Sequence, residues 1–280
     1  MKINKTLIIL SLLLVFCISL SAVSATEDIS VNDTTVESSA MNEEINAVGD
    51  EEIHYFSKIM DEIKTGAGIF YIEHDYIIDE TWTVSSFRSI AIDGQGHTIY
   101  GNGNQAFYIG GNSVEIRNLN FVNCSDSFVK HNGDIRNNAK GGAIHFYGVD
   151  GFVTNCSFVN CSANDNGGAI YFENEGDVRG CSFENCVALD GGAIYFGQGD
   201  VYDCNFVNCS ANDKGGAIYF SGKGYLYDCN FVNCSANKRN YHPYSAIYDI
   251  YQAYIFNCSF ENCRGKDSTV FHFCCVCFMT

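Results

Sequence analysis

The stretch that decides the fold is Cys156-Ser157-Phe158-Val159-Asn160-Cys161, which leads after a few polar residues into Gly167-Gly168-Ala169-Ile170-Tyr171-Phe172. Variants of the first hexapeptide begin at Cys181, Cys204, Cys229 and Cys258, and successive Gly-Gly pairs begin at Gly141, Gly167, Gly191 and Gly215. A period of about 24 residues, built from short apolar runs between Gly and Asn, is typical of a solenoid. One repeat cannot bury its own apolar face, so the repeats must stack.

Each repeat is long enough for three short strands and three turns, with strands of successive repeats paired in parallel about 4.8 Å apart. We therefore predict an all-β solenoid, a parallel β-helix. Residues 55–64 carry apolar side chains three and four positions apart and end near Gly66, which predicts a short amphipathic helix. That helix is expected to cap the apolar end of the first turn.

Strand alternation places Cys156 and Phe158 on one face, which we predict to be the interior because both residue types prefer burial. Asn160 then stands at a corner, where equivalent asparagines of successive turns are expected to form an inward-facing amide ladder. Six Asn-Cys-Ser sequences are glycosylation sequons, but inward asparagines could not carry a glycan. Asn32 is the more accessible acceptor on this interpretation.

After each Gly-Gly pair, Ile and Phe are expected to point inward and the residue between them outward. This alternation predicts an outward aromatic stripe made of His145, Tyr171, Tyr195 and Tyr219. Aromatic faces along a groove suit sugar rings, so these residues are the candidate ligand-binding site. The alternative is that the rings only stack across strands and stabilise the sheet.

The cysteines have two interpretations. Disulfides are the default in a secreted chain. Equivalent cysteines on neighbouring turns, however, have Cβ atoms about 4.8 Å apart, wider than a disulfide prefers, although a pair across one corner such as Cys156–Cys161 is feasible. We predict columns of buried thiols. Uniform copies fill a core rather than build one four-ligand site, so no metal and no cofactor are expected.

Four segments are predicted along the chain. Residues 1–25 have the basic start, apolar middle and small-residue end of a signal peptide. Residues 26–52 form an acidic leader without aromatic residues, which composition predicts to be disordered. Residues 53–273 form the β-helix, with clear repeats at 114–267, and residues 274–280 form an irregular apolar tail.

The net charge of −17 argues against nucleic acid as a partner, and after the signal no segment reaches the roughly 20 apolar residues of a membrane span. Insertions at 127–140 and 237–244 are expected to collect on one face of the solenoid. The turns Asn164–Asn166 and Asn212–Asp213 could bind calcium. A set of carboxylates occupies similar turn positions: Asp177, Asp200, Asp203 and Asp228.

The Gly-Gly-Ala-Ile and Phe-x-Asn phrases resemble the repeats of polymorphic outer membrane proteins. Together with the signal ending Ala22-Val23-Ser24-Ala25, the acidic leader and Ile92-Asp93-Gly94-Gln95-Gly96-His97-Thr98-Ile99, the layout is similar to adhesin-like surface proteins of methanogenic archaea. The resemblance covers residues 1–267. It implies a right-handed, pectin-lyase-like parallel β-helix displayed at the cell surface, with a role in attachment. Chains of that family usually carry more turns and an anchoring part.

Two functions are consistent with these patterns. The first is a secreted or cell-surface adhesin without enzymatic activity, whose partners are surface glycans or the surface of a host or partner cell. The second is a carbohydrate-active β-helix enzyme, a polysaccharide lyase or glycosidase, which requires two carboxylates, or a carboxylate and a cation, at one place on the solenoid. Near-identical turns offer an extended surface and no unique site, so we predict the adhesin, with no catalytic residues.

Overall fold

The structure is a computed structural model that describes residues 53–59, 68–86, 89–111, 113–126, 130–131, 134–135, 139–236, 246–250, 252–263 and 271–273. The chain divides into two units, Met1–Glu52 and Ile53–Thr280, and all of the described residues belong to the second. The predicted signal, leader and tail therefore lie outside the described residues. In the described part of the chain, no helix has the length and apolar character that crossing a membrane requires.

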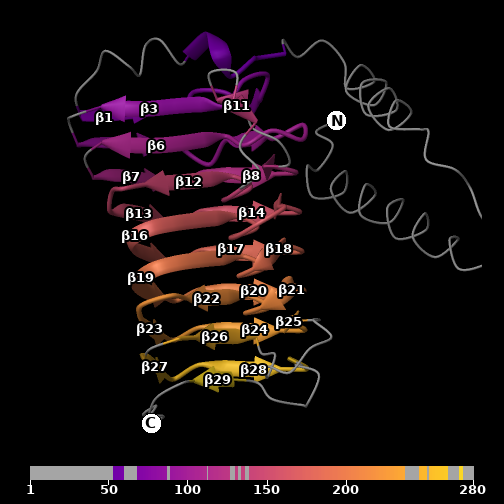
Figure 1. The fold of residues 1–280 in the computed structure, drawn as a ribbon. Helices are drawn as coiled ribbons and strands as arrows, with labels where there is room; N and C mark the ends of the chain where they lie inside the picture. Colours follow the sequence, from indigo (N-terminus) through magenta and orange to yellow (C-terminus); the bar gives the residue numbers. More distant parts are fainter. Residues whose placement is uncertain are drawn as a thin grey trace, which may run out of the picture. The chain divides into compact units, whose positions relative to one another are not determined.

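The described residues of Ile53–Thr280 form stacked turns of parallel β-structure around a hydrophobic core, which confirms the prediction of an all-β parallel β-helix (Figure 1). The largest sheet, called here the wide sheet, has fourteen strands. They are β1 (Gly68–Tyr71), β3 (Trp82–Ser86), β4 (Ile90–Asp93), β6 (Phe107–Gly111), β7 (Val114–Arg117), β12 (Ile144–Tyr147), β13 (Gly151–Thr154), β16 (Ile170–Arg179), β19 (Ile194–Tyr202), β22 (Ile218–Phe220), β23 (Lys223–Tyr227), β26 (Ile247–Asp249), β27 (Gln252–Phe256) and β29 (Phe271–Phe273).

Two smaller parallel sheets form the other sides of the solenoid. The narrow sheet has eight strands: β2 (Tyr76–Ile77), β5 (Thr98–Tyr100), β8 (Asn120–Val122), β14 (Ser157–Val159), β17 (Ser182–Glu184), β20 (Asn205–Val207), β24 (Asn230–Val232) and β28 (Ser259–Glu261). The short sheet has five: β9 (Ser125–Asp126), β15 (Ser162–Ala163), β18 (Val187–Asp190), β21 (Ser210–Lys214) and β25 (Ser235–Ala236). A separate antiparallel pair joins β10 (Lys130–His131) to β11 (Asp134–Ile135).

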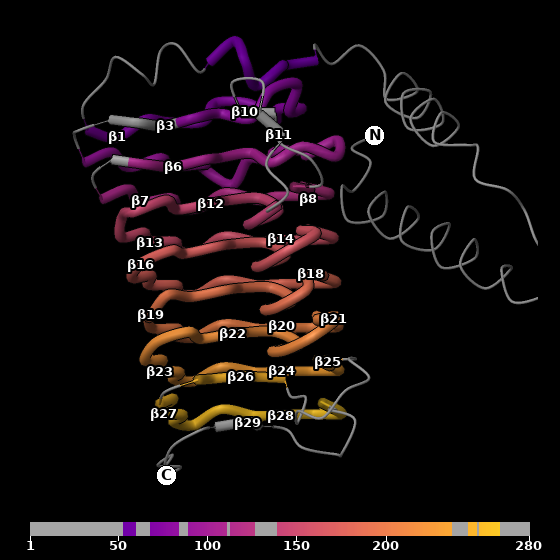
Figure 2. Tube along the Cα trace, viewed as in Figure 1, coloured from indigo at the N-terminus to yellow at the C-terminus, as the bar shows by residue number. Residues whose placement is uncertain are grey.

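Equivalent residues of successive turns pair in register, so the turns lie one above another (Figure 2). Phe158 of β14 pairs with Phe121 above it and Phe183 below it. All three rings are buried, and neighbouring ring centroids in this column are 4.9 Å apart with nearly parallel planes. The prediction that Cys-x-Phe faces the interior is therefore confirmed.

The eleven cysteines of the described residues are all free, as the interpretation of buried thiols predicts. They form two columns that flank the phenylalanine column, with ten of them buried and Cys258 half-buried. Burial raises the pKa of the Cys161, Cys186 and Cys209 thiols well above the usual value, which keeps them protonated. These thiols therefore act as small apolar side chains that fill the core.

We expect the buried thiols to resist alkylation until the protein unfolds, because the thiolate is the reactive form and the core excludes the reagent. Peptide mapping after iodoacetamide treatment should show Cys258 labelled first among the eleven and Cys204 labelled only in denaturant. Rapid labelling of Cys204 in the folded protein would contradict the closed core.

The corner between the narrow and short sheets is built from asparagines with left-handed backbone. Asn123, Asn160, Asn185, Asn208 and Asn233 have φ between 54° and 55°. Nδ2 of each of the last four donates to Oδ1 of the asparagine in the turn before it, at 3.1–3.2 Å, which forms the predicted ladder. The prediction that these side chains face inward is wrong. The next cysteine fills the core at this corner, and the asparagines lie on the outer surface.

Each Gly-Gly pair makes the turn from the short sheet back to the wide sheet. Gly167 has φ 68°, which favours glycine. A Cβ on Gly168 would lie 2.1 Å from the carbonyl oxygen of Gly192 in the next turn, so the second position excludes every larger residue.

The N-terminal end of the core is covered by the segment that starts at Ile53. Phe56 is fully buried, its ring centroid lies 5.3 Å from that of Phe107, and its N–H donates to the carbonyl of Ile77 at 3.0 Å. Residues 57–59 are helical, which is the start of the predicted capping helix. The remainder of that predicted helix lies outside the described residues.

Candidate binding surface

The predicted aromatic stripe forms one continuous column on the wide sheet. Its six members, each paired in register with the next, are Tyr108, His145, Tyr171, Tyr195, Tyr219 and Tyr248. Neighbouring ring centroids lie 4.7–5.2 Å apart. Ile170 and Phe172 on either side of Tyr171 belong to the core, so the stripe points away from the core as predicted.

The column is nevertheless almost closed to solvent. Tyr171 and Tyr219 are 6% and 5% exposed, His145 is 9% exposed, and Tyr195 is half-buried. Burial raises the pKa of Tyr171 to about 12, with nearby Glu173 and Asp165 adding to the effect. From Tyr171 to Tyr248 each ring stacks on the next, and His145 meets Tyr108 and Tyr171 edge to face. The ring faces covered by these contacts are closed to a sugar ring. This geometry fits the alternative interpretation, cross-strand stacking that stabilises the sheet.

The stripe is covered by the residues that precede the Gly-Gly pairs. Lys140 Nζ lies 3.1 Å from the hydroxyl oxygen of Tyr171 and 4.5 Å from its ring centroid, and Lys214 Nζ lies 5.3 Å from the ring centroid of Tyr248. Each cation therefore reaches the tyrosine of the following turn. Asp190 precedes the Gly191–Gly192 pair, as Lys140 and Lys214 precede theirs. Burial raises the pKa of Asp190 to about 6.

A second set of aromatic side chains lies on the other half of the wide sheet, and sequence analysis missed it. This aromatic face consists of two neighbouring columns, Tyr202, Tyr227 and Phe256 in one and Tyr225 and Tyr254 in the other. Neighbouring ring centroids in each column are 4.8 Å apart. All five side chains are half-buried and alternate with buried residues such as Leu226 and Ile255. The alternation in Tyr225-Leu226-Tyr227 and Tyr254-Ile255-Phe256 was the available signal.

Charged residues border the aromatic face on the turns that precede it. Arg179 pairs with Asp177 at 2.6 Å, and its guanidinium carbon lies 4.3 Å from the ring centroid of Tyr202. The Tyr202 hydroxyl donates to Asp200 Oδ2 at 3.2 Å. Burial raises the pKa of Asp200, the register partner of Asp177. Ring edges, hydroxyls and carboxylates thus share one outer surface.

The carboxylates noted in the sequence divide into two groups. Asp177 and Asp200 are register partners on the outer face of β16 and β19. Asp203 and Asp228 are exposed corner residues with φ of 53° and 56°. The structure therefore brings together only the first two with Arg179. His145 belongs to the buried stripe on the other half of the sheet.

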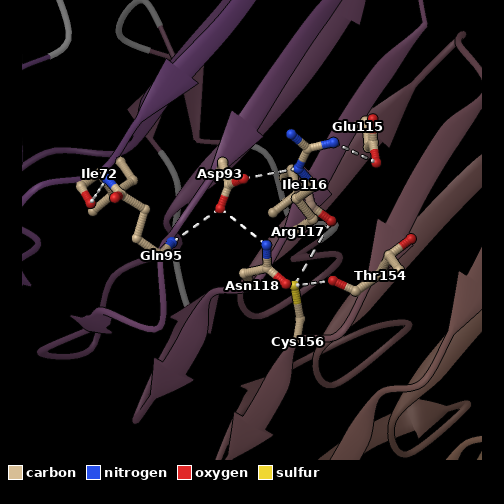
Figure 3. A network of polar contacts seen from close by, with 9 residues as sticks. All are labelled: Ile72, Asp93, Gln95, Glu115, Ile116, Arg117, Asn118, Thr154 and Cys156. Atoms are coloured by element: carbon tan, nitrogen blue, oxygen red, sulfur yellow. Dashed lines mark hydrogen bonds and ion pairs between the residues drawn. The ribbon is translucent and has the colours of Figure 1, made fainter.

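The sequence motif Ile92–Ile99, which contains Asp93, has a structural role at the turn that follows β4 (Figure 3). Asp93 accepts hydrogen bonds from Arg117 Nε, Asn118 Nδ2 and the Gln95 N–H, at 3.0, 3.0 and 3.1 Å. Burial alone would raise the pKa of Asp93, but the bonds from Asn118, Gln95 and Arg117 outweigh it and lower that pKa. Nη1 of Arg117 also lies 3.5 Å from Oε1 of Glu115. The three hydrogen bonds to Asp93 hold the turn that follows β4 against the next turn of the solenoid.

In the part of the chain that the structure describes, no group of three or more His, Cys, Asp and Glu side chains is arranged to hold a metal ion. The side chain of Asp190 accepts a hydrogen bond from the Lys214 N–H at 3.0 Å, so this carboxylate satisfies a backbone group of the short sheet. Calcium at the Asn164–Asn166 and Asn212–Asp213 turns stays a prediction.

Comparisons of the chain with protein-family models, with curated proteins and with solved structures gave no match.

Proposed function

We propose that this protein is an exported, adhesin-like attachment protein that binds surface polysaccharide through the aromatic face. The observation that carries the proposal is the grouping of five partly exposed rings on one outer surface, Tyr202, Tyr225, Tyr227, Tyr254 and Phe256. Stacked rings turn their edges and phenol hydroxyls outward. Such a surface offers apolar C–H contact together with hydrogen bonds, which is what a hydroxyl-rich chain requires.

Repetition supports attachment rather than catalysis. Equivalent side chains recur about every 4.8 Å along the solenoid, so a polymer with its own repeat can make the same contact several times. Several weak contacts on one chain add up to useful avidity. The net charge of −17 favours neutral or cationic polysaccharides over acidic ones.

Removal of two rings tests the aromatic face. The amount of the double variant Tyr225→Ala/Tyr254→Ala that the preferred polysaccharide retains should be at least about tenfold lower than that of the unchanged protein. Large aromatic side chains carry much of the binding energy in such contacts. A panel of insoluble neutral, acidic and amino polysaccharides in pull-down assays gives the measurement, with Tyr225→Phe separating the hydroxyl from the ring.

The matched control is Tyr71→Ala, which removes a 49% exposed tyrosine from β1 at the other end of the wide sheet. It should bind as the unchanged protein does. Equal retention of the double variant and the unchanged protein, with both folded by circular dichroism, would remove the aromatic face from the proposal.

A carbohydrate-active enzyme is the second candidate. Asp177 and Asp200 are register partners on neighbouring strands, and glycosidases that retain configuration use carboxyl groups about 5–5.5 Å apart. Asp177 is paired with Arg179, and the raised pKa of Asp200 suits a proton donor. Assays for new reducing or unsaturated ends on the bound polysaccharides separate the candidates. New ends that Asp200→Asn abolishes would establish the enzyme and overturn the adhesin.

A further inference from the structure

The six Asn-Cys-Ser sequons have no part in the proposed attachment, and the structure places them on two outer corners of the solenoid. Asn123, Asn160, Asn208 and Asn233 belong to the amide ladder between the narrow and short sheets. Asn155 and Asn257 belong to the corner between the wide and narrow sheets, where the backbone is also left-handed. All six acceptor positions are therefore directed away from the core, in contrast to the sequence-based expectation.

Most of the side-chain amide nitrogens of these asparagines already donate a hydrogen bond. Nδ2 of Asn160, Asn208 and Asn233 donates to the asparagine of the preceding turn at 3.1–3.2 Å. Nδ2 of Asn257 donates to the carboxylate of Asp228. A glycan on any of these would also stand directly against a neighbouring corner side chain about 4.8 Å away.

Asn155 is exposed, as are Asn160, Asn208, Asn233 and Asn257. Unlike those four, it makes no side-chain hydrogen bond to another described residue. The corner residue of the following turn is Gly180, where an added Cβ would lie 2.6 Å from Asn155 Oδ1. The amide therefore rests over a position without a side chain. Asn123, at the start of the ladder, is half-buried, and its Oδ1 accepts a hydrogen bond from Asn160.

We infer that Asn155 is an N-glycosylation site whose glycan the folded solenoid accommodates. The donor is an oligosaccharide linked through phosphate to a membrane lipid. A bond forms between Asn155 Nδ2 and the anomeric carbon of the first sugar, and the bond from that carbon to the lipid phosphate breaks. Nδ2 gives up one proton, and the lipid phosphate leaves. The proposal rests on the export that the proposed function requires, because such donors and transferases act outside the cytoplasm.

The position of Asn155 keeps a glycan clear of the aromatic face. Thr154, its neighbour on β13, pairs with Arg179, and Arg179 pairs with Tyr202, so Asn155 precedes the first ring of the face by two turns. Two turns correspond to about 10 Å along the solenoid. Glycosylation at Asn155 and binding at the aromatic face are therefore compatible on one molecule.

The test is peptide mapping by mass spectrometry of the full chain, exported from a host that glycosylates Asn-x-Ser sequons. Enzymatic release of the glycan converts its asparagine to aspartate, which marks the site. We expect Asn155 to be occupied. Ser157→Ala, which destroys that sequon and keeps Asn155, should abolish the glycan. Ser210→Ala, which destroys the sequon of Asn208, should leave it unchanged.

Unmodified Asn155 in the exported, folded protein would overturn the inference, whether or not another sequon is occupied. A chain that fails to leave the cell on its own first 25 residues would instead count against the proposed function. In that case the same chain behind the host's own signal still gives the occupancy of Asn155, so the two failures are distinguishable.

Discussion

Phe183→Asp is expected to unfold the middle turns of the solenoid. The Phe183 side chain is 1% exposed, and its ring centroid lies 4.9 Å from that of Phe158 and 4.8 Å from that of Phe206. The thiols of Cys181 and Cys186, on either side along the chain, are buried in the same core. A carboxylate introduced at position 183 would therefore lie among apolar side chains of the described core.

Two costs add in this variant. Loss of a buried phenylalanine typically removes about 3–5 kcal/mol, and burial of an unpaired carboxylate costs several kcal/mol more. Together they approach the whole stability of a typical domain, about 5–15 kcal/mol. Because each turn of a solenoid contacts only its neighbours, the damage should be greatest in the turns that contain Phe158, Phe183 and Phe206.

Circular dichroism, urea unfolding and limited proteolysis provide the measurements. The variant should lose β signal at ambient temperature and be cut within the middle turns. Val187→Asp is the matched control, since Val187 belongs to the same turn and is 38% exposed. It should unfold at nearly the same urea concentration as the unchanged protein. An unchanged melting curve for Phe183→Asp would contradict the buried phenylalanine column.

Residues whose environment repeats in every turn were predicted well from the sequence. Period-two alternation is enough to place Cys156 and Phe158 on one face, and the repeat itself supplies the neighbours above and below. The Gly-Gly corner is equally local. Positive φ at Gly167 and the missing Cβ at Gly168 are each required by the backbone alone.

The candidate site was predicted less well, because burial of an outward side chain depends on other parts of the turn. Tyr171 does point away from the core, yet Lys140 from the preceding turn lies across it. A pattern of alternation describes the two faces of a strand and carries no information about what covers the outer face. The burial of the stripe thus follows from the path of the chain before each Gly-Gly pair.

The corner asparagines illustrate a different limit. The sequence indicates that Asn160 stands at a turn, and an amide ladder follows from the repeat. In the structure these asparagines have left-handed backbone and lie on the outer surface, a direction that the repeat alone does not indicate. Asparagine tolerates this conformation better than most residues, which is a signal that the sequence contained.

One buried carboxylate occupies a position of the short sheet where the following strands place buried alanines. Asp126 of β9 is 3% exposed and pairs with Ala163, the first of the buried alanines on the following strands. Its Oδ2 accepts a hydrogen bond from the Lys140 N–H at 2.8 Å, while its Oδ1 has no hydrogen-bond partner among the described residues. Gln105 donates from Nε2 to the carbonyl of the same Lys140 at 2.7 Å.

Burial raises the pKa of Asp126 to about 7, and the hydrogen bond from Lys140 only partly offsets this. The folded protein therefore binds this proton more tightly than the unfolded chain, whose aspartates have a pKa of about 3.9. The contribution of Asp126 is most favourable below about pH 4, declines as the pH rises toward 7, and is constant above that. Ionisation of Asp126 at pH 8 should cost up to about 4 kcal/mol of unfolding free energy.

Asp126→Asn removes this charge and keeps an oxygen that can accept from the Lys140 N–H. The new amide donors cost about 1–3 kcal/mol if they find no acceptor, so we expect a net gain of about 1–3 kcal/mol at pH 8. The gain should shrink steadily as the pH is lowered to 5. Asp190, whose pKa is about 6, also destabilises the fold at high pH, but it is present in both proteins and cancels in the comparison.

Urea unfolding of both proteins across pH 4–8 measures this difference directly. Asp150→Asn serves as the control, because Asp150 is exposed and its replacement should change stability by no more than about 0.5 kcal/mol. A stability difference between Asp126→Asn and the unchanged protein that does not vary with pH would mean that Asp126 titrates normally. The carboxylate would then have to be solvated in solution, and the start of the short sheet would be open there rather than closed against Lys140.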